Sequence, residues 1–174
     1  MQFILGDITR LETLEAIGEV DVVFCAGVLY HHPSPFDLLV ALRRICRETL
    51  ILRTSTIPEV RGLPNAAVYF PMLDAAGREL WNLKSLGLLH QAGISNEFQP
   101  AEGYGNWFWG LTPSCLESLL KTAGFRVDFR ATEAFAQSVV CTAVAPALEH
   151  RLPDQLSARR LAEEISAAGI ARPA

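Results

Sequence analysis

A tyrosine and two histidines lie side by side at residues 30–32, within the stretch FCAGVLYHHPSPFDLL. An imidazole ring gains or loses a proton near neutral pH, and a tyrosine hydroxyl both donates and accepts hydrogen bonds. The three rings follow an apolar run and precede a Ser-Pro pair, which is typical of a helix start. His31 is therefore a candidate general base, and Tyr30 a candidate lining residue. The alternative is an ordinary strand-to-helix loop whose polar rings bond to the backbone.

The neighbouring histidines His31 and His32 do not predict a metal site. Adjacent side chains rarely converge on one ion, and no carboxylate or thiolate lies at ligand spacing from them. The four cysteines are scattered, without CxxC spacing, in apolar surroundings: Cys25, Cys46, Cys115 and Cys141. We interpret them as reduced core thiols of a cytoplasmic protein.

The composition is that of one globular domain. The chain has 174 residues, of which 50% are hydrophobic, and a net charge of -4. These values exclude a disordered chain and a strongly basic surface, so DNA is not an expected partner. No run of ~18 apolar residues predicts a membrane span. The first residues, MQFILGDITR, lack the basic region and cleavage site of a secretory signal, which again favours the cytoplasm.

Hydrophobic periodicity and turn residues predict which elements hold these side chains in place. Strands are expected at residues 2–7, 20–28, 49–56, 126–135 and 138–147, with a turn at Ala136 and Gln137 between the last two. Helices are expected at residues 9–18, 34–48, 112–124 and 156–171, and a short one at 79–89. Residues 58–111 are too long for a simple connection, so we interpret them as an insertion or lid.

This order predicts an α/β fold whose sheet is mainly parallel and ends in an antiparallel hairpin. In such sheets ligands bind outside the carboxyl ends of the strands. Three strand ends would meet there: Gly6-Asp7, Cys25 to Tyr30, and Arg53 to Ser55. The sequence therefore predicts that the Tyr-His-His cluster lies at a ligand crevice.

Three segments carry a family resemblance: LGDITRL, EVDVVFCAGVLYHHPSPFDLLVALRRI and NWFWGLTPSCLESLLKTAGFRV. Together they resemble the C-terminal two-thirds of a class I S-adenosylmethionine-dependent methyltransferase with a Rossmann-like sheet. The GVLYH form is similar to a subgroup that includes the tRNA wobble-uridine carboxymethyltransferase and many methyltransferase-domain proteins. The resemblance covers residues 1–146, a partial methyltransferase domain that includes the 58–111 insertion. Residues 147–174 are expected to form a C-terminal tail helix.

The resemblance implies a transferase that uses S-adenosyl-L-methionine and assigns roles to single residues. It implies that the Asp7 carboxylate accepts a hydrogen bond from the adenine amino group, although a turn or helix-cap role fits Asp7 equally. It makes His31 the candidate catalytic base. The residues implied to bind the cofactor are Gly6, Asp7, Ile8, Cys25, Ala26, Gly27 and Tyr30. Those implied to bind the substrate are Tyr30, His31, Asn106, Trp107 and Trp109, although lid packing is an alternative for the tryptophans.

One part of the family pattern is missing from this sequence. The glycine-rich loop that holds the methionine part of the cofactor is absent, as is the acidic residue that holds its ribose. The chain therefore resembles an N-terminally truncated methyltransferase with an open, apolar sheet edge. The expected activity is methyl transfer to a small-molecule or tRNA acceptor. The open edge predicts a homodimer, or a partner chain that supplies the missing N-terminal half; the alternative is a non-catalytic, degenerate interaction subunit.

Overall fold

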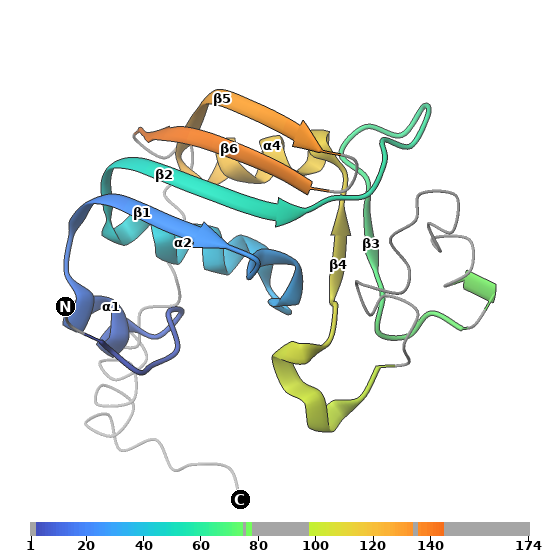
Figure 1. Ribbon diagram of the computed structural model, residues 1–174, viewed down its shortest axis with the longest axis horizontal. Helices are drawn as coiled ribbons and strands as arrows, with labels where there is room; N and C mark the ends of the chain where they lie inside the picture. Colours follow the sequence, from blue (N-terminus) through green and yellow to red (C-terminus); the bar gives the residue numbers. More distant parts are fainter. Residues whose placement is uncertain (1–2, 75, 78–97, 134–135, 145–174) are drawn as a thin grey trace, which may run out of the picture.

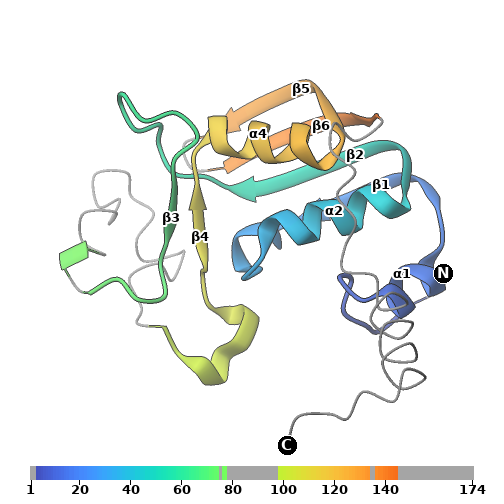
Figure 2. The ribbon, with the colours of Figure 1, turned by 180° about the vertical axis from the view of Figure 1, so that it is seen from behind.

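A computed structural model describes residues 3–74, 76–77, 98–133 and 136–144, with Tyr104 described by its backbone alone. Its centre is a four-stranded sheet in the order β1-β2-β6-β5, with helices α2 and α4 on one face (Figures 1 and 2). The strands are β1 (Val20–Ala26), β2 (Cys46–Ser55), β5 (Phe125–Glu133) and β6 (Ala136–Ala143). The helices are α1 (Leu11–Ile17), α2 (Pro35–Ile45) and α4 (Pro113–Ala123). The predicted helices at 79–89 and 156–171 lie outside the described residues.

Helix ends follow the predicted signals. Thr112 is the N-cap of α4, and its hydroxyl oxygen accepts a hydrogen bond from the Cys115 amide at 3.2 Å. Gly124 ends this helix with a φ of 99°, a left-handed conformation that glycine adopts without strain. Ser34 precedes α2 with Pro35 in its first turn, as predicted. The Ser34 side chain donates a hydrogen bond to Asp37 and does not cap the helix backbone.

Residues 3–7 form no strand, which corrects the prediction for this segment. Phe3 and Leu5 are 84% and 104% exposed, and no strand pairs with the outer edge of β1 within the described residues. Extended chain becomes a strand only where a neighbour completes the hydrogen-bond ladder. The α/β class and the antiparallel terminal hairpin are confirmed. The parallel part is the β1–β2 pair, whereas β6 pairs antiparallel with both β2 and β5.

Ala136 and Gln137 do not form the turn that was predicted for the terminal hairpin. Ala136 and Gln137 are the first residues of β6 and pair with Glu133 and Thr132 of β5. Gln137 is only 3% exposed, because it also pairs with Thr54 on the other side. A residue held between two strands cannot form the turn, so the predicted turn at Ala136 and Gln137 is wrong.

The hydrophobic core lies between the sheet and helices α2 and α4. Alternate residues of β2 and β6 point into it, as expected for strands that are covered on one face. Its fully buried members include Leu39, Leu50, Leu116 and Phe125. Each such side chain stabilises the fold by about 1.5–3 kcal/mol through removal from water. The core thus fixes the carboxyl ends of β1 and β2, where the candidate site begins.

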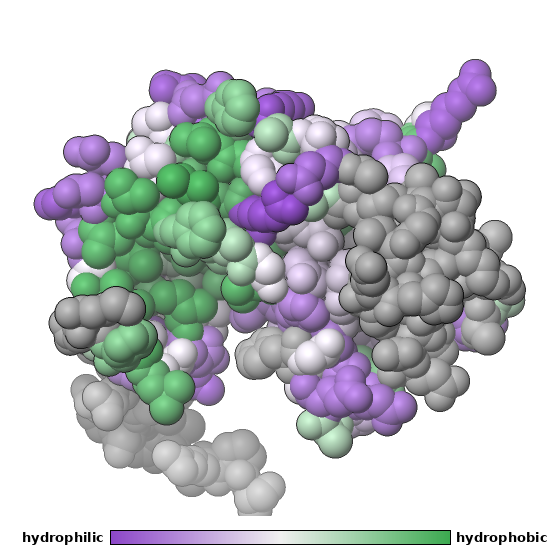
Figure 3. Space-filling model, in the orientation of Figure 1, coloured by the Kyte–Doolittle hydropathy of each residue, from purple (hydrophilic) through white to green (hydrophobic). Residues whose placement is uncertain are grey.

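The opposite face of the sheet is bare within the described residues. Four apolar residues on successive strands are register partners and form one row across this face: Phe24, Ile51, Val140 and Phe129. Phe24 is 70% exposed and Phe129 is 61% exposed. Figure 3 shows the apolar side chains gathered over the sheet on this side. The predicted open apolar surface is therefore present as a face as well as an edge.

None of the helices in the described part combines the length and apolarity needed to cross a membrane.

The segment predicted as an insertion or lid contains a second, two-stranded sheet. Strand β3 (Ala67–Tyr69) pairs antiparallel with β4 (Trp109–Leu111), beside the carboxyl ends of β1 and β2 (Figures 1 and 2). The 3-10 helix η3 (Pro100–Gly105) leads into β4. This small sheet was not predicted, because three-residue strands are too short for a visible periodicity.

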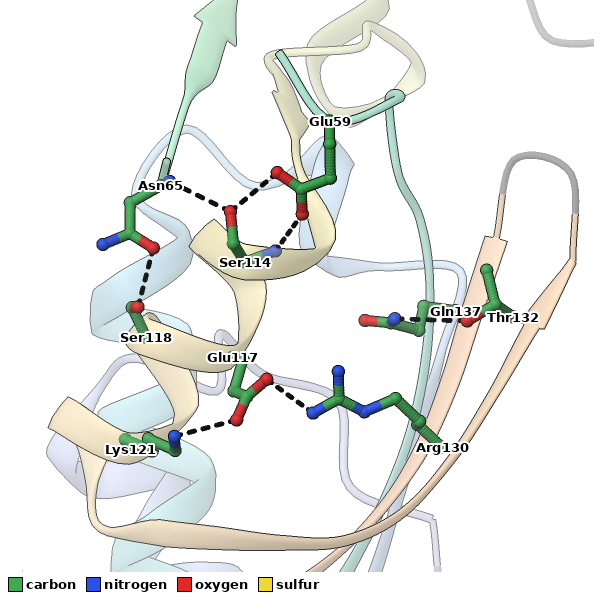
Figure 4. Close-up of polar contacts among 9 residues, drawn as sticks. All are labelled: Glu59, Asn65, Ser114, Glu117, Ser118, Lys121, Arg130, Thr132 and Gln137. Atoms are coloured by element: carbon green, nitrogen blue, oxygen red, sulfur yellow. Dashed lines mark hydrogen bonds and ion pairs between the residues drawn. The ribbon is translucent and has the colours of Figure 1, made fainter. Parts of the chain in front are cut away.

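Polar contacts attach the chain before β3 to helix α4 (Figure 4). The Glu59 carboxylate accepts hydrogen bonds from the Ser114 amide at 2.7 Å and from its hydroxyl at 2.9 Å. The Ser114 hydroxyl oxygen accepts from the Asn65 amide, and the Ser118 hydroxyl donates to the Asn65 side chain. An acidic group at a helix N-terminus is favoured by the unpaired amides and the helix dipole. The chain that leads into the second sheet is therefore bonded directly to the main domain.

Candidate functional site

A pocket of about 540 Å³ lies at the carboxyl end of β1. It is lined by two segments that are distant in the sequence, the chain before α1 and the chain around the 3-10 helix η1 (Leu29–His31). Its lining residues are Gly6, Asp7, Ile8, Gly27, Val28, His31 and His32. Five of these residues were predicted from the sequence to bind cofactor or substrate: Gly6, Asp7, Ile8, Gly27 and His31. Val28 was missed, although its place directly after a predicted lining residue is the signal that could have found it.

Asp7 combines a local structural role with an available acceptor. Its Oδ1 accepts hydrogen bonds from the Thr9 amide at 2.9 Å and the Thr9 hydroxyl at 2.7 Å, which forms the turn that precedes α1. The Thr9 amide bond is the main cause that lowers the pKa of Asp7 below its ordinary value. Its Oδ2 makes only a 3.9 Å ion pair with Arg10. The N-cap of α1 is Arg10, so the turn role, and not the cap role, is the one present.

Gly27 follows β1 directly and has a φ of 73°, which allows the chain to turn out of the sheet beside the pocket. The Cys25 side chain points to the opposite side, into the core, and is 8% exposed. Burial raises the pKa of Cys25 to about 11, so it is a neutral thiol at physiological pH. Neither Cys25 nor Ala26 lines the pocket; their part in a cofactor site would be limited to the backbone that leads into Gly27.

Tyr30, His31 and Trp107 form an aromatic cluster beside the pocket. The ring centroid of Tyr30 lies 4.1 Å from that of His31 and 4.3 Å from that of Trp107. The Phe108 amide donates a hydrogen bond to the Tyr30 carbonyl oxygen at 2.9 Å. Two segments that are far apart in the sequence are thus joined by ring contacts and a backbone bond. The structure therefore brings together the predicted Tyr30, His31 and Trp107.

The orientation of His31 is set by one hydrogen bond. Its Nδ1 lies 2.8 Å from the Asn106 carbonyl oxygen, which can only accept, so Nδ1 donates. The lone pair of the neutral ring is then on Nε2. Since His31 also lines the pocket, this arrangement is one that a proton acceptor at the site requires.

His32 is part of the loop structure. Its Nδ1 lies 2.8 Å from the Ser34 carbonyl oxygen and 3.0 Å from the Ser34 amide nitrogen, and the residue is 9% exposed. His31 and His32 thus have different partners and do not converge. Within the described ranges, no group of three or more potential metal-ligating side chains occurs.

The remaining predicted substrate residues, Asn106 and Trp109, are placed differently. Asn106 is 6% exposed, and its side chain is bonded to the backbone of its own loop. The Trp109 Nε1 donates to the Pro33 carbonyl oxygen at 2.9 Å, which fastens β4 to the loop after His32. The Tyr69 ring lies 5.0 Å from that of Trp109 and was missed by the sequence reasoning, because the strand that pairs the two was not predicted.

The strand end predicted at Arg53 to Ser55 and two arginines of the main domain have partners within the fold. Arg53 makes a bidentate pair with Glu133 at 2.7 Å, and Thr54 is 1% exposed. Arg43 donates hydrogen bonds to three backbone carbonyl oxygens. Arg47 is paired with Asp21. These contacts explain the arginines as structural residues.

No family model matches the chain. It is 38% identical over 87 residues to a tRNA U34 carboxymethyltransferase of Shewanella sediminis (strain HAW-EB3). The alignment covers 43% of this chain and 26% of that protein, so the chain spans about a quarter of the length of the curated relative it matches. The predicted resemblance to the tRNA wobble-uridine carboxymethyltransferase is confirmed over this segment.

Solved structures with similar folds include the N-terminal domain of EvdMO1 with S-adenosylhomocysteine bound, at 20% identity and a TM-score of 0.47. The match covers 82% of this chain and 52% of that one. Magnesium protoporphyrin IX methyltransferase from Synechocystis PCC 6803, also with S-adenosylhomocysteine bound, matches at 16% identity and a TM-score of 0.43. That match covers 81% of this chain and 50% of that one.

Proposed function

We propose that this chain carries one part of the cofactor and acceptor sites of an S-adenosylmethionine-dependent methyltransferase. The observation that carries the proposal is the pocket in which residues 6–8 meet Gly27 and His31. These are the two chain segments that the family resemblance assigns to the cofactor, and the fold brings them to one place. The sequence similarity over 87 residues to a tRNA U34 carboxymethyltransferase, an enzyme named for transfer of a carboxymethyl group, supports the broader class of group transfer to an acceptor. The acceptor we propose is a small molecule or an RNA.

The residues of the pocket fit the adenosine part of such a cofactor. Ile8 and Val28 offer apolar surfaces to a planar ring, and Gly27 lets a ligand approach the backbone closely. The Asp7 Oδ2 is placed to accept a hydrogen bond from an exocyclic amine, since Oδ1 is already engaged. The pocket volume, about 540 Å³, is within the usual range for small-molecule sites of about 300–1,000 Å³.

When bound, S-adenosylmethionine would supply a methyl group on a positively charged sulfur. The chain's own residues would orient the acceptor and take its proton. Tyr30 and Trp107 provide an aromatic wall beside the pocket, on which a planar acceptor can stack. His31 Nε2 is the candidate proton acceptor, and alignment of the two reactants would supply most of the rate acceleration. We also propose a cytoplasmic location, because all four cysteines are buried, unpaired thiols.

Calorimetric titration of the 174-residue chain with S-adenosylhomocysteine tests the proposal. The informative variant is Asp7→Asn, because an Asn Oδ1 can still accept the Thr9 bonds while its amide replaces the Oδ2 acceptor with a donor. Loss of one hydrogen bond to the ligand, about 1–1.5 kcal/mol, predicts an affinity about tenfold weaker. Asp128→Asn, on the far edge strand β5, is the control and should bind as the parent does. Absence of binding heat for the parent chain at high micromolar ligand would rule out autonomous cofactor binding.

A non-catalytic interaction subunit is the second candidate. The observation that favours it is the bare apolar row of Phe24, Ile51, Val140 and Phe129 beside the unpaired edge of β1 within the described residues. A face of this kind covered by another chain would predict a concentration-dependent oligomer. Sedimentation velocity over a wide concentration range, repeated with Phe24→Ser, distinguishes this candidate: a monomer at every concentration, without bound partner, argues against it.

A further inference from the structure

The segment at residues 99–108 contacts the candidate base His31, and the Asn106 side chain forms hydrogen bonds within this segment. The Asn106 Oδ1 accepts a hydrogen bond from the Gln99 amide at 2.9 Å. Its Nδ2 donates to the Gln99 carbonyl oxygen at 2.8 Å and to the Gly103 carbonyl oxygen at 2.9 Å. Both amide protons of the side chain are therefore used within the loop. Asn106 is also only 6% exposed, so its side chain has little free surface to offer a substrate.

The backbone of the same residue reaches His31. The Asn106 carbonyl oxygen accepts the hydrogen bond from His31 Nδ1 at 2.8 Å. The next two residues fix the rest of the cluster, since the Trp107 ring packs on Tyr30 and the Phe108 amide bonds to the Tyr30 carbonyl. The position of this carbonyl oxygen thus depends on how the loop is closed, and the loop is closed by the Asn106 side chain.

We propose that Asn106 is a positioning residue that fixes the tautomer of His31. With Nδ1 held as the donor to Asn106, the neutral ring carries its lone pair on Nε2, which is then the proton acceptor of a residue that lines the pocket. This inference rests on the proposed function, in which Nε2 receives the proton of the methyl acceptor. It also replaces the substrate-binding role that the sequence implied for Asn106, because the amide that would bind a substrate is already engaged.

An asparagine is required by the chemistry of the loop. The three groups around the side chain are one amide donor and two carbonyl acceptors, and only an uncharged carboxamide satisfies all three from one short side chain. An aspartate at this position would keep the acceptor but lose both donors, and would leave the Gln99 and Gly103 carbonyl oxygens without their partner. Buried carbonyls that lose a hydrogen bond are costly, so the loop would open or shift.

Long-range ¹H–¹⁵N NMR of the imidazole nitrogens tests the inference on the full chain. In the parent protein His31 should occur as a single tautomer, with the proton on Nδ1. Asn106→Asp should give a mixture of both tautomers. Gln99→Ala is the matched control: the Gln99 contacts to Asn106 are made by its backbone, so this variant should keep the single tautomer.

The measurement on the parent protein needs no variant and is decisive by itself. If the neutral His31 ring carries its proton on Nε2, the inference is wrong, even if Asn106→Asp fails to fold. If Asn106→Asp folds and keeps the Nδ1 tautomer, Asn106 does not position His31. Neither result depends on cofactor binding, so titration with S-adenosylhomocysteine separates failure of this inference from failure of the proposed function.

Discussion

Replacing Arg43 by methionine tests whether the fold is held together as the contacts indicate. The Arg43 guanidinium donates to the Val144 carbonyl oxygen at 2.8 and 3.0 Å, to that of Cys46 at 2.9 Å and to that of Gly124 at 3.2 Å. Its Cζ also lies 5.9 Å from the centre of the Phe125 ring. One side chain thus joins the end of α2, the end of α4 and the end of β6.

The expected loss follows from these bonds. Methionine preserves the apolar stem of the side chain but removes every donor, and the carbonyl oxygens of Cys46 and Val144 lose their charged partner. Hydrogen bonds from charged donors contribute about 1.5–3 kcal/mol each, and part of this returns through hydration of a half-buried site. We therefore expect the free energy of unfolding to fall by about 2–4 kcal/mol.

Urea denaturation of the full chain, followed by circular dichroism, measures this change. With an m-value of about 2 kcal/mol/M, in the middle of the usual range for urea, the midpoint should move by about 1–2 M. Arg44→Met is the matched control, because Arg44 is exposed on the same helix; its change should stay within about 0.5 kcal/mol. Equal effects of the two substitutions would refute the assignment of Arg43 as the link between the three segments.

Two further predictions concern packing and pH. Gly110→Ala should lower the free energy of unfolding by about 1–3 kcal/mol in urea titrations, since its Cβ would lie 2.8 Å from the Phe70 ring; Gly105→Ala, which meets only ordinary contacts, should not. Burial raises the pKa of Cys25 to about 11 and that of Cys141 to about 12. The stability that these protonated thiols contribute is therefore complete below about pH 8.5 and lost as pH rises toward 11, by up to about 1.4 kcal/mol per pH unit per thiol. Cys25→Ala should flatten this decline between about pH 8.5 and 10.5, and an unchanged slope would contradict the burial effect.

Local signals predicted the regular parts of the fold. The ends of α2 and α4 were visible as Ser34-Pro35, Thr112-Pro113 and Gly124, because helix-end signals depend on a few adjacent residues, although the Ser34 side chain does not cap the backbone. The segment 2–7 was predicted as a strand from its apolar run, yet nothing in the described part of the chain pairs with it. Pairing is a property of two segments, so a single apolar run cannot reveal whether its neighbour is present.

The candidate site was only partly visible in the same way. Gly6, Asp7, Gly27 and His31 were identified because strand ends and a family-like segment mark them. The role proposed for Asn106 could not be predicted from the sequence, since it depends on hydrogen bonds to residues 99 and 103 and on a backbone carbonyl that accepts from residue 31. Such distances follow from loop geometry, which has no periodic signal.

By itself, the sequence determined the residue types at the site and the helices and strands that bring them near one edge of the sheet. Hydrophobic spacing and end-capping residues are local features, so they can be recognised from the sequence alone. Only the tertiary structure decided which nitrogen of His31 is hydrogen-bonded to the backbone, that the Cys25 side chain lies in the core, and which face of the sheet is bare within the described residues. These depend on contacts between segments far apart in the chain, and the Asn106 loop, 75 residues after His31, is the clearest case.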